Sequence, residues 1–110
     1  MDIDEYLNPL DEAELAASFE ASRPFKHLVI PQLLRPEFLE EVREAYPSYK
    51  EAKRIAHSEF RRVNENLKLQ ITEPERFPAP VRTLHEVLAS EDFRSRLGRI
   101  TGIEDLLADP

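Results

Sequence analysis

The distribution of proline and glycine most constrains what this chain of 110 residues can fold into, because it has nine prolines and only two glycines. Proline lacks an amide hydrogen and fixes its own φ, so it suits the first turn of a helix and interrupts one further along. Pro9 and Pro36 stand where helices can begin, and Pro47 stands where the second helix must stop. Three prolines between Glu73 and Pro80 predict an extended loop.

Apolar residues spaced three and four apart predict four to five helices. We expect helices at about residues 9–21, 36–46, 49–60, 79–89 and 91–101. Asn8 is a suitable cap for the first helix, and Ser90 for the last. Gly102 is a natural left-handed stop, with Ile103 as the apolar residue that folds back on the helix.

Two segments have the pattern of strands. Residues 25–34 are apolar and β-branched in the middle, and residues 67–71 alternate apolar with polar side chains. Two strands form only a marginal sheet in water. We therefore predict a helix-rich α+β fold with about two strands, which either are fully covered by helices or join further strands from elsewhere.

The net charge of −7 is confined to the start of the chain. Residues 1–22 hold seven of the 22 acidic side chains and no lysine or arginine, so residues 23–110 carry 15 acids and 15 bases. This asymmetry divides the chain into an acidic, helical lead-in at 1–22 and a neutral body at 23–110.

A smaller basic stretch lies at residues 50–62, where five basic residues face two acidic ones for a local net charge of +3. Binding of phosphate or nucleic acid needs a denser basic field, and single-strand binding needs interleaved aromatic rings. We therefore interpret the stretch as a solvated helix face and do not expect nucleic acid as a partner.

The composition excludes several further classes. The two glycines, Gly98 and Gly102, fit neither of the glycine-rich phosphate loops. The chain has no cysteine, so disulfides, thiolate metal sites and cysteine nucleophiles are excluded, which fits a cytoplasmic location. No apolar run is long enough to span a membrane, and the acidic start has no secretory signal pattern.

The histidines give one arrangement to weigh. His57 and Glu59 form a His-x-carboxylate pair, and His85 follows downstream, so the three could form the facial triad of a non-haem iron enzyme. Such a short pattern is common by chance, and this one lies in a charged, helical stretch. No serine lies in the sequence motif of a nucleophile elbow, and the expected role of Ser90 is that of a helix cap. The residues by themselves therefore predict no catalytic, cofactor-binding or metal site.

Three runs along the chain resemble the N-terminal portion of the 2-oxoglutarate- and Fe(II)-dependent oxygenases of the prolyl-4-hydroxylase-like superfamily. The first is Pro24-Phe-Lys-His-Leu-Val-Ile-Pro-Gln-Leu-Leu34 followed by a helix from Pro36 to Pro47, and the second is the strand 67–71. The third runs from Phe77 through Ser90-Glu-Asp-Phe93 to Ile100-Thr-Gly-Ile-Glu-Asp-Leu-Leu-Ala-Asp-Pro110. The resemblance covers about residues 24–110.

The resemblance implies a non-catalytic part of a hydroxylase. The resemblance implies that residues 23–110 are the N-terminal α/β support region, whose two strands would join the larger sheet of a double-stranded β-helix. In that family, this later core carries the His-x-Asp and distal histidine that bind iron. Those ligands are missing from residues 1–110, so we expect no cofactor in this chain and no activity alone. Fe(II) and 2-oxoglutarate are expected for the complete family member. The expected partner is the remainder of the oxygenase.

An alternative interpretation is a small stand-alone interaction or regulatory module. It would form a homodimer, or bind a protein partner through its exposed strand edges.

Overall fold

The computed structural model describes residues 1–55, 58–60, 68–71 and 73–107. The chain forms two compact units: residues 1–39 together with 86–110, and residues 40–85. We refer to them as the terminal unit and the central unit, and each is described by itself.

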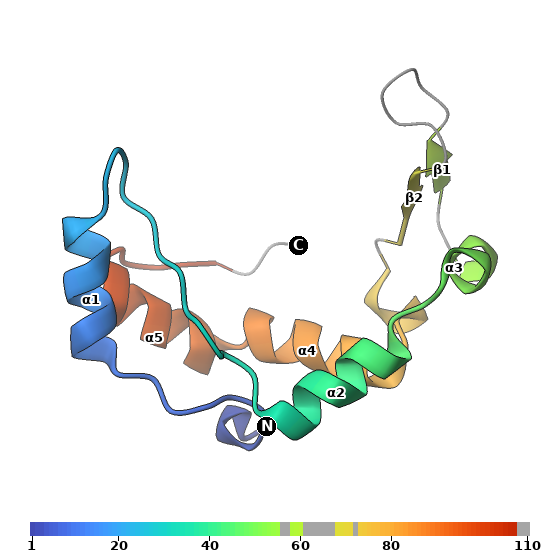
Figure 1. The fold of residues 1–110 in the computed structure, drawn as a ribbon, viewed down its shortest axis with the longest axis horizontal. Coiled ribbons are helices and arrows are strands. Elements are labelled where there is room, and N and C mark those ends of the chain that lie inside the picture. The colour runs from blue at the N-terminus through green and yellow to red at the C-terminus, as the bar shows by residue number, and fades with distance from the viewer. Residues whose placement is uncertain (56–57, 61–67, 72, 108–110) are drawn as a thin grey trace. The chain divides into compact units, whose positions relative to one another are not determined.

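Helices make up most of the described chain, as Figure 1 shows. In chain order the elements are η1 (Ile3–Glu5), α1 (Glu12–Ala21), α2 (Pro36–Ala45), α3 (Tyr49–Ile55), β1 (Ser58–Phe60), β2 (Lys68–Gln70), η2 (Pro74–Arg76), α4 (Ala79–Ala89) and α5 (Glu91–Thr101). The five α-helices lie at the five places where the apolar spacing predicts them. The end predicted for the helix at 49–60 is wrong, because α3 is described only as far as Ile55 and residues 58–60 form β1.

The predicted α+β fold class is wrong, because the described chain is a helical protein. The segment 25–34 forms no strand, and only an isolated bridge joins Leu34 to Leu7. β1 and β2 are three residues each and pair antiparallel, with Glu59 opposite Leu69. A pair this short does not build a sheet layer. Apolar β-branched residues favour an extended backbone, but a strand also needs a hydrogen-bonded neighbour along its length. Among the described residues, this segment has one only at its end, where the Leu33 carbonyl accepts from the Asn8 amide at 2.9 Å.

The cap of α1 also differs from the prediction. The helix begins at Glu12, and the Asp11 carboxylate accepts a hydrogen bond from the Glu14 amide at 3.1 Å. Asn8 instead donates its side-chain amide to the carbonyls of Gln32 at 2.6 Å and Leu34 at 3.0 Å. An asparagine can cap a helix or bridge two chain segments, and here the tertiary contact prevails.

The ends of α5 follow the sequence rules. The Ser90 hydroxyl accepts a hydrogen bond from the Phe93 amide at 3.2 Å, and Gly102 ends the helix in the left-handed conformation with φ of 75°. The predicted contact of Ile103 is wrong, since half of its surface stays exposed (51%). The chain leaves α5 along the helix instead of folding Ile103 underneath it.

The core of the terminal unit is small. Ile3, Leu7 and Val87 are fully buried, and Phe93 is nearly so. Tyr6 packs its ring against Phe38, with ring centres 4.8 Å apart. The partly buried side chains around this cluster are Tyr6, Leu33, Leu34 and Leu97. Residues of the acidic lead-in therefore supply two of the three fully buried side chains.

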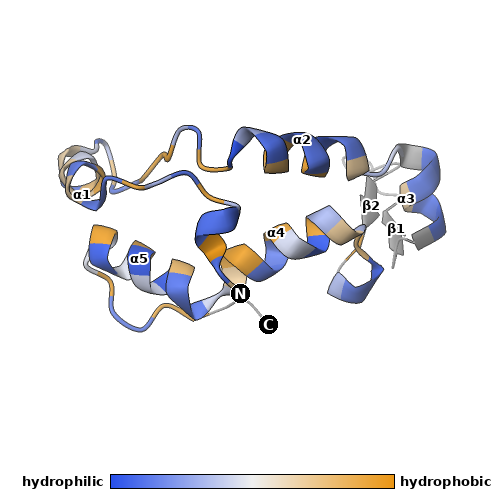
Figure 2. Ribbon diagram, turned by 90° about the horizontal axis from the view of Figure 1, so that it is seen from below, coloured by the Kyte–Doolittle hydropathy of each residue, from blue (hydrophilic) through white to orange (hydrophobic). Residues whose placement is uncertain are grey.

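Helix α2 is largely hydrophilic, as its colouring in Figure 2 shows. Phe38 and Val42 are the buried positions of its apolar stripe. Leu39 and Tyr46, predicted on the same stripe, are exposed. The stripe is therefore narrower in the structure than the sequence pattern indicates.

Candidate functional site: the groove beside helix α5

The residues weighed as an iron triad are only partly described. His57 lies outside the described residues, and Glu59 is described only as a backbone position in β1. His85 lies on α4 and makes an edge contact with Phe77, with ring centres 5.9 Å apart. In the described ranges, no three His, Asp or Glu side chains gather closely enough to hold a metal ion.

The basic stretch 50–62 is also divided. Lys50, Lys53 and Arg54 lie exposed on α3, while Arg61 and Arg62 are outside the described residues. The interpretation of this stretch as a solvated helix face therefore stays a prediction.

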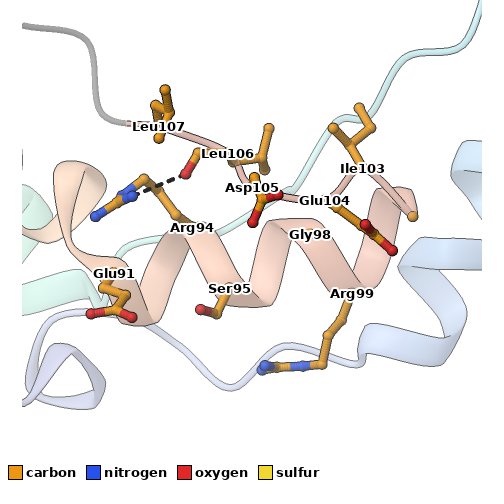
Figure 3. A pocket seen from close by; sticks show the side chains of 11 residues that line it. Glu91, Arg94, Ser95, Gly98, Arg99, Ile103, Glu104, Asp105, Leu106 and Leu107 are labelled. Carbon is orange, nitrogen blue, oxygen red and sulfur yellow. Dashed lines mark hydrogen bonds between the residues drawn. The ribbon is translucent and has the colours of Figure 1, made fainter.

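A groove of the terminal unit lies between α5 and the segment that follows it. We call residues Gly102–Leu107 the connector and this space the α5 groove; its volume is about 720 Å³. Figure 3 shows the connector running beside the helix. The groove is lined by Glu91, Arg94, Ser95, Gly98, Arg99, Gly102, Ile103, Glu104, Asp105, Leu106 and Leu107.

Both glycines of the chain serve this arrangement. Gly102 adopts a φ of 75°, which an L side chain rarely tolerates, and this turns the chain out of the helix. A Cβ placed on Gly98 would lie 3.1 Å from the Ile103 carbonyl oxygen. The absence of a side chain at Gly98 therefore lets the connector approach the helix closely.

Hydrogen bonds hold the connector against α5. The Arg94 guanidinium donates to the Leu106 carbonyl at 2.9 Å and to the Ala89 carbonyl at 3.1 Å, and the first bond is drawn in Figure 3. The Thr101 hydroxyl donates to the Leu97 carbonyl at 2.8 Å and accepts the Ile103 amide at 3.3 Å. These contacts engage backbone groups, so they leave the apolar side chains of the connector free.

Two apolar side chains of the connector remain in solvent. Ile103 is 51% exposed and Leu107 is 84% exposed, and both point away from α5 in Figure 3. Ser95, the hydroxyl in the groove, has no histidine among the groove residues to activate it.

Two arginines of α5 form an ionic clamp to the acidic lead-in, and one of them, Arg99, also lines the α5 groove. Arg96 binds Asp4 at 2.8 Å and Asp92 at 2.9 Å, and Arg99 binds Glu12 at 2.8 Å. The hydrogen bond from Arg96 lowers the pKa of the Asp4 carboxyl, and the hydrogen bond from Arg99 lowers that of Glu12. Hydrogen bonds to the Asp4 and Asp92 carboxylates raise the pKa of the Arg96 guanidinium.

Sequence reasoning missed this clamp and the role of Arg94. Asp4 and Arg96 are 92 positions apart, and Glu12 and Arg99 are 87 apart. No local pattern links residues at such separations. The only signal was the absence of any base in residues 1–22, which requires partners from elsewhere.

Comparisons of this chain with protein-family models, with curated proteins and with solved structures found no match. None of the helices in the described ranges is both long and apolar enough to cross a membrane.

Proposed function

We propose that this chain is the non-catalytic N-terminal support region of a 2-oxoglutarate- and Fe(II)-dependent oxygenase that hydroxylates a peptidyl or small-molecule substrate. The order and spacing of the resembling runs across residues 24–110 motivate the proposal. The geometry of the connector is the observation that carries it. Its backbone is bound to α5, and two of its apolar side chains, Ile103 and Leu107, are exposed.

The connector would act as the docking strip for the catalytic domain. An apolar side chain that is left in water contributes little to stability, whereas its burial against a partner stabilises the assembly by roughly 25 cal/mol per Å² of apolar surface. Ile103 and Leu107 offer such surface, and the bonds from Arg94 and Thr101 hold the strip in place beforehand. A strip ordered in advance loses less conformational entropy on docking.

Iron chemistry would belong wholly to the catalytic domain. The part of this chain that the structure describes offers no His, Asp or Glu cluster that fits Fe(II), so no reaction step is assigned to it. The support region would order the start of the catalytic sheet and border the substrate entrance. We also propose a cytoplasmic location, supported by the absence of cysteine.

The coding sequence that follows Pro110 provides the first test. The proposal expects a His-x-Asp pair and a later histidine in the same frame. A following domain without them would refute the oxygenase assignment.

A second test uses the 110-residue chain alone with Fe(II), ascorbate and 2-oxoglutarate. The proposal expects no iron-dependent release of succinate above a metal-free control. Succinate release that His57→Ala and His85→Ala abolish would overturn the non-catalytic assignment and support the triad.

A further inference from the structure

An extended segment of the terminal unit has unused backbone hydrogen-bonding groups. Residues 26–30 run as an extended thread between the loop after α1 and the turn at Pro31 (Figure 1). Among the described residues, the amides and carbonyls of Leu28, Val29 and Ile30 have no hydrogen-bond partner. Unpaired backbone groups along an extended segment form a template for another strand.

The side chains of this segment alternate as in a half-buried strand. Leu28 and Ile30 are half-buried, whereas His27 and Val29 are exposed. The His27 amide donates to the Ser22 hydroxyl at 3.0 Å, so the odd-numbered amides face the body of the protein. Successive amides of a strand point to opposite edges. The free outer edge therefore carries the backbone groups of residues 26, 28 and 30.

We propose that a second copy of this chain pairs with this edge, antiparallel and around a two-fold axis at Leu28. In this register Leu28 lies opposite Leu28 of the other copy, and Lys26 lies opposite Ile30. The exposed odd-numbered residues then pair as His27 with Val29. Every outward-facing amide and carbonyl of residues 26, 28 and 30 gains a partner.

Charge complementarity selects a second copy as the occupant. Asp11 and Glu14 line a groove of about 470 Å³ together with Val29, Ile30 and Pro31. The proposed register brings Lys26 of one copy to this acidic end of the other. Its present partner is Glu20, in an exposed pair at 3.4 Å that contributes little and can be exchanged.

The neighbouring registers are less favourable. Centring the pair on His27 places two His27 side chains opposite each other and removes Lys26 from the acidic groove. Centring it on Val29 places Pro31 opposite His27, and proline cannot donate to the ladder. The Leu28 register is flanked by prolines at 24 and 31, which limits the pairing to a short stretch.

This dimer is independent of the proposed oxygenase role, because it concerns only the terminal unit and no iron. The paired stretch is short, so we expect weak association, on the order of 10 μM. Sedimentation or light scattering from about 1 μM to about 1 mM should show mass rising from 12.8 kDa toward twice that value. A constant monomer mass over this range would overturn the proposal.

A proline at the centre tests whether the backbone edge mediates the association. Leu28→Pro removes the central amide in both copies, and we expect the dissociation constant to rise about 30-fold. Leu28→Ala keeps the amide and is the matched control, with a smaller effect. Circular dichroism should show unchanged helix content for both, because Leu28 lies outside every helix. Equal dissociation constants for the two variants would contradict the backbone pairing.

Cysteine cross-linking tests the register, since the chain has no cysteine of its own. In the Leu28 register the two Leu28 Cα atoms lie about 5.5 Å apart, which suits a disulfide, while the two Val29 residues are diagonal neighbours about 7–8 Å apart. Leu28→Cys should therefore form disulfide dimers much faster than Val29→Cys on mild oxidation. The reverse order would exclude this register.

A charge exchange tests the choice of a second copy. Lys26→Glu should weaken the dimer about tenfold, because two attractive contacts become repulsive. Adding Glu14→Lys should restore the affinity to within about threefold. Failure of the double variant to recover would show that Lys26 does not meet the acidic groove of a second copy.

Discussion

Arg96 holds Asp4 across almost the whole length of the chain, with Nη1 of the guanidinium 2.8 Å from a carboxylate oxygen. The side chain of Arg96 is only 16% exposed, whereas the basic side chains of the other ion pairs given for the described residues are 45–72% exposed. Asp92 binds the same guanidinium, so one arginine joins the first turn of α5 to the start of the chain. The acidic lead-in is thus part of the terminal unit's packing.

Removing this guanidinium should destabilise the terminal unit. Arg96→Ala leaves Asp4 and Asp92 without their shared partner, and we expect the melting temperature to fall by about 5 °C. Arg96→Lys keeps the charge but loses the forked geometry, so its effect should be intermediate. Arg43→Ala is the control, because Arg43 pairs with Glu40 on the exposed surface of α2. Equal melting temperatures for Arg96→Ala and Arg43→Ala would contradict a structural role for the clamp.

The clamp should make the fold sensitive to acid. Asp4 and Glu12 have pKa values lowered from 3.8 and 4.5 by their arginine partners, so the unfolded chain binds protons more readily than the folded one. The stabilisation is therefore fully present above these ordinary values and is lost as the pH falls through the lower folded values. Urea midpoints between pH 6 and pH 2 should show this decline, and Asp4→Asn with Glu12→Gln should flatten it. A decline of the same steepness in the double variant would assign it to other carboxyl groups.

The two glycines should respond differently to alanine. Gly102→Ala places a side chain at a φ of 75° and should destabilise the protein by about 1 kcal/mol. Gly98→Ala gains helix propensity and displaces only the exposed connector by a few tenths of an ångström, so global stability should change little.

Hydrogen exchange separates these two effects. In Gly98→Ala, the connector amides from Ile103 onward should exchange faster while the α5 amides stay protected. Unchanged exchange in the connector would show that the Gly98–Ile103 approach has no structural consequence.

The bridging role of Asn8 and the capping role of Asp11 should be separable by mutation. Asn8→Asp cannot donate to the carbonyls of Gln32 and Leu34, so we expect a loss of about 1–2 kcal/mol with unchanged helix content. Asp11→Ala removes the cap of α1 and should cost about 1 kcal/mol together with helical signal at 222 nm. Aspartate caps as well as asparagine, so Asn8→Ala is the variant that tests capping, and loss of helical signal in Asn8→Ala would instead make Asn8 the functional cap.

The predictions that hold concern neighbours in the chain. The helix at 79–89, the Ser90 cap and the Gly102 stop depend on groups within one turn of each other, and the structure confirms all three. Of the candidate site, this local reasoning predicted the start of the connector at Gly102. Gly98 and Arg94 were not predicted, since their roles depend on where the connector returns.

The sequence by itself therefore determined the helices, most of their ends and the imbalance of charge, because backbone hydrogen bonds and caps act over three or four residues. Only the tertiary structure decided that Asp4 and Glu12 meet Arg96 and Arg99, that Asn8 bridges to Leu34, and that 25–34 stays without a strand partner. These outcomes depend on which distant segments come together. Tertiary packing determines which segments meet, and the local conformational propensity of a segment does not predict it.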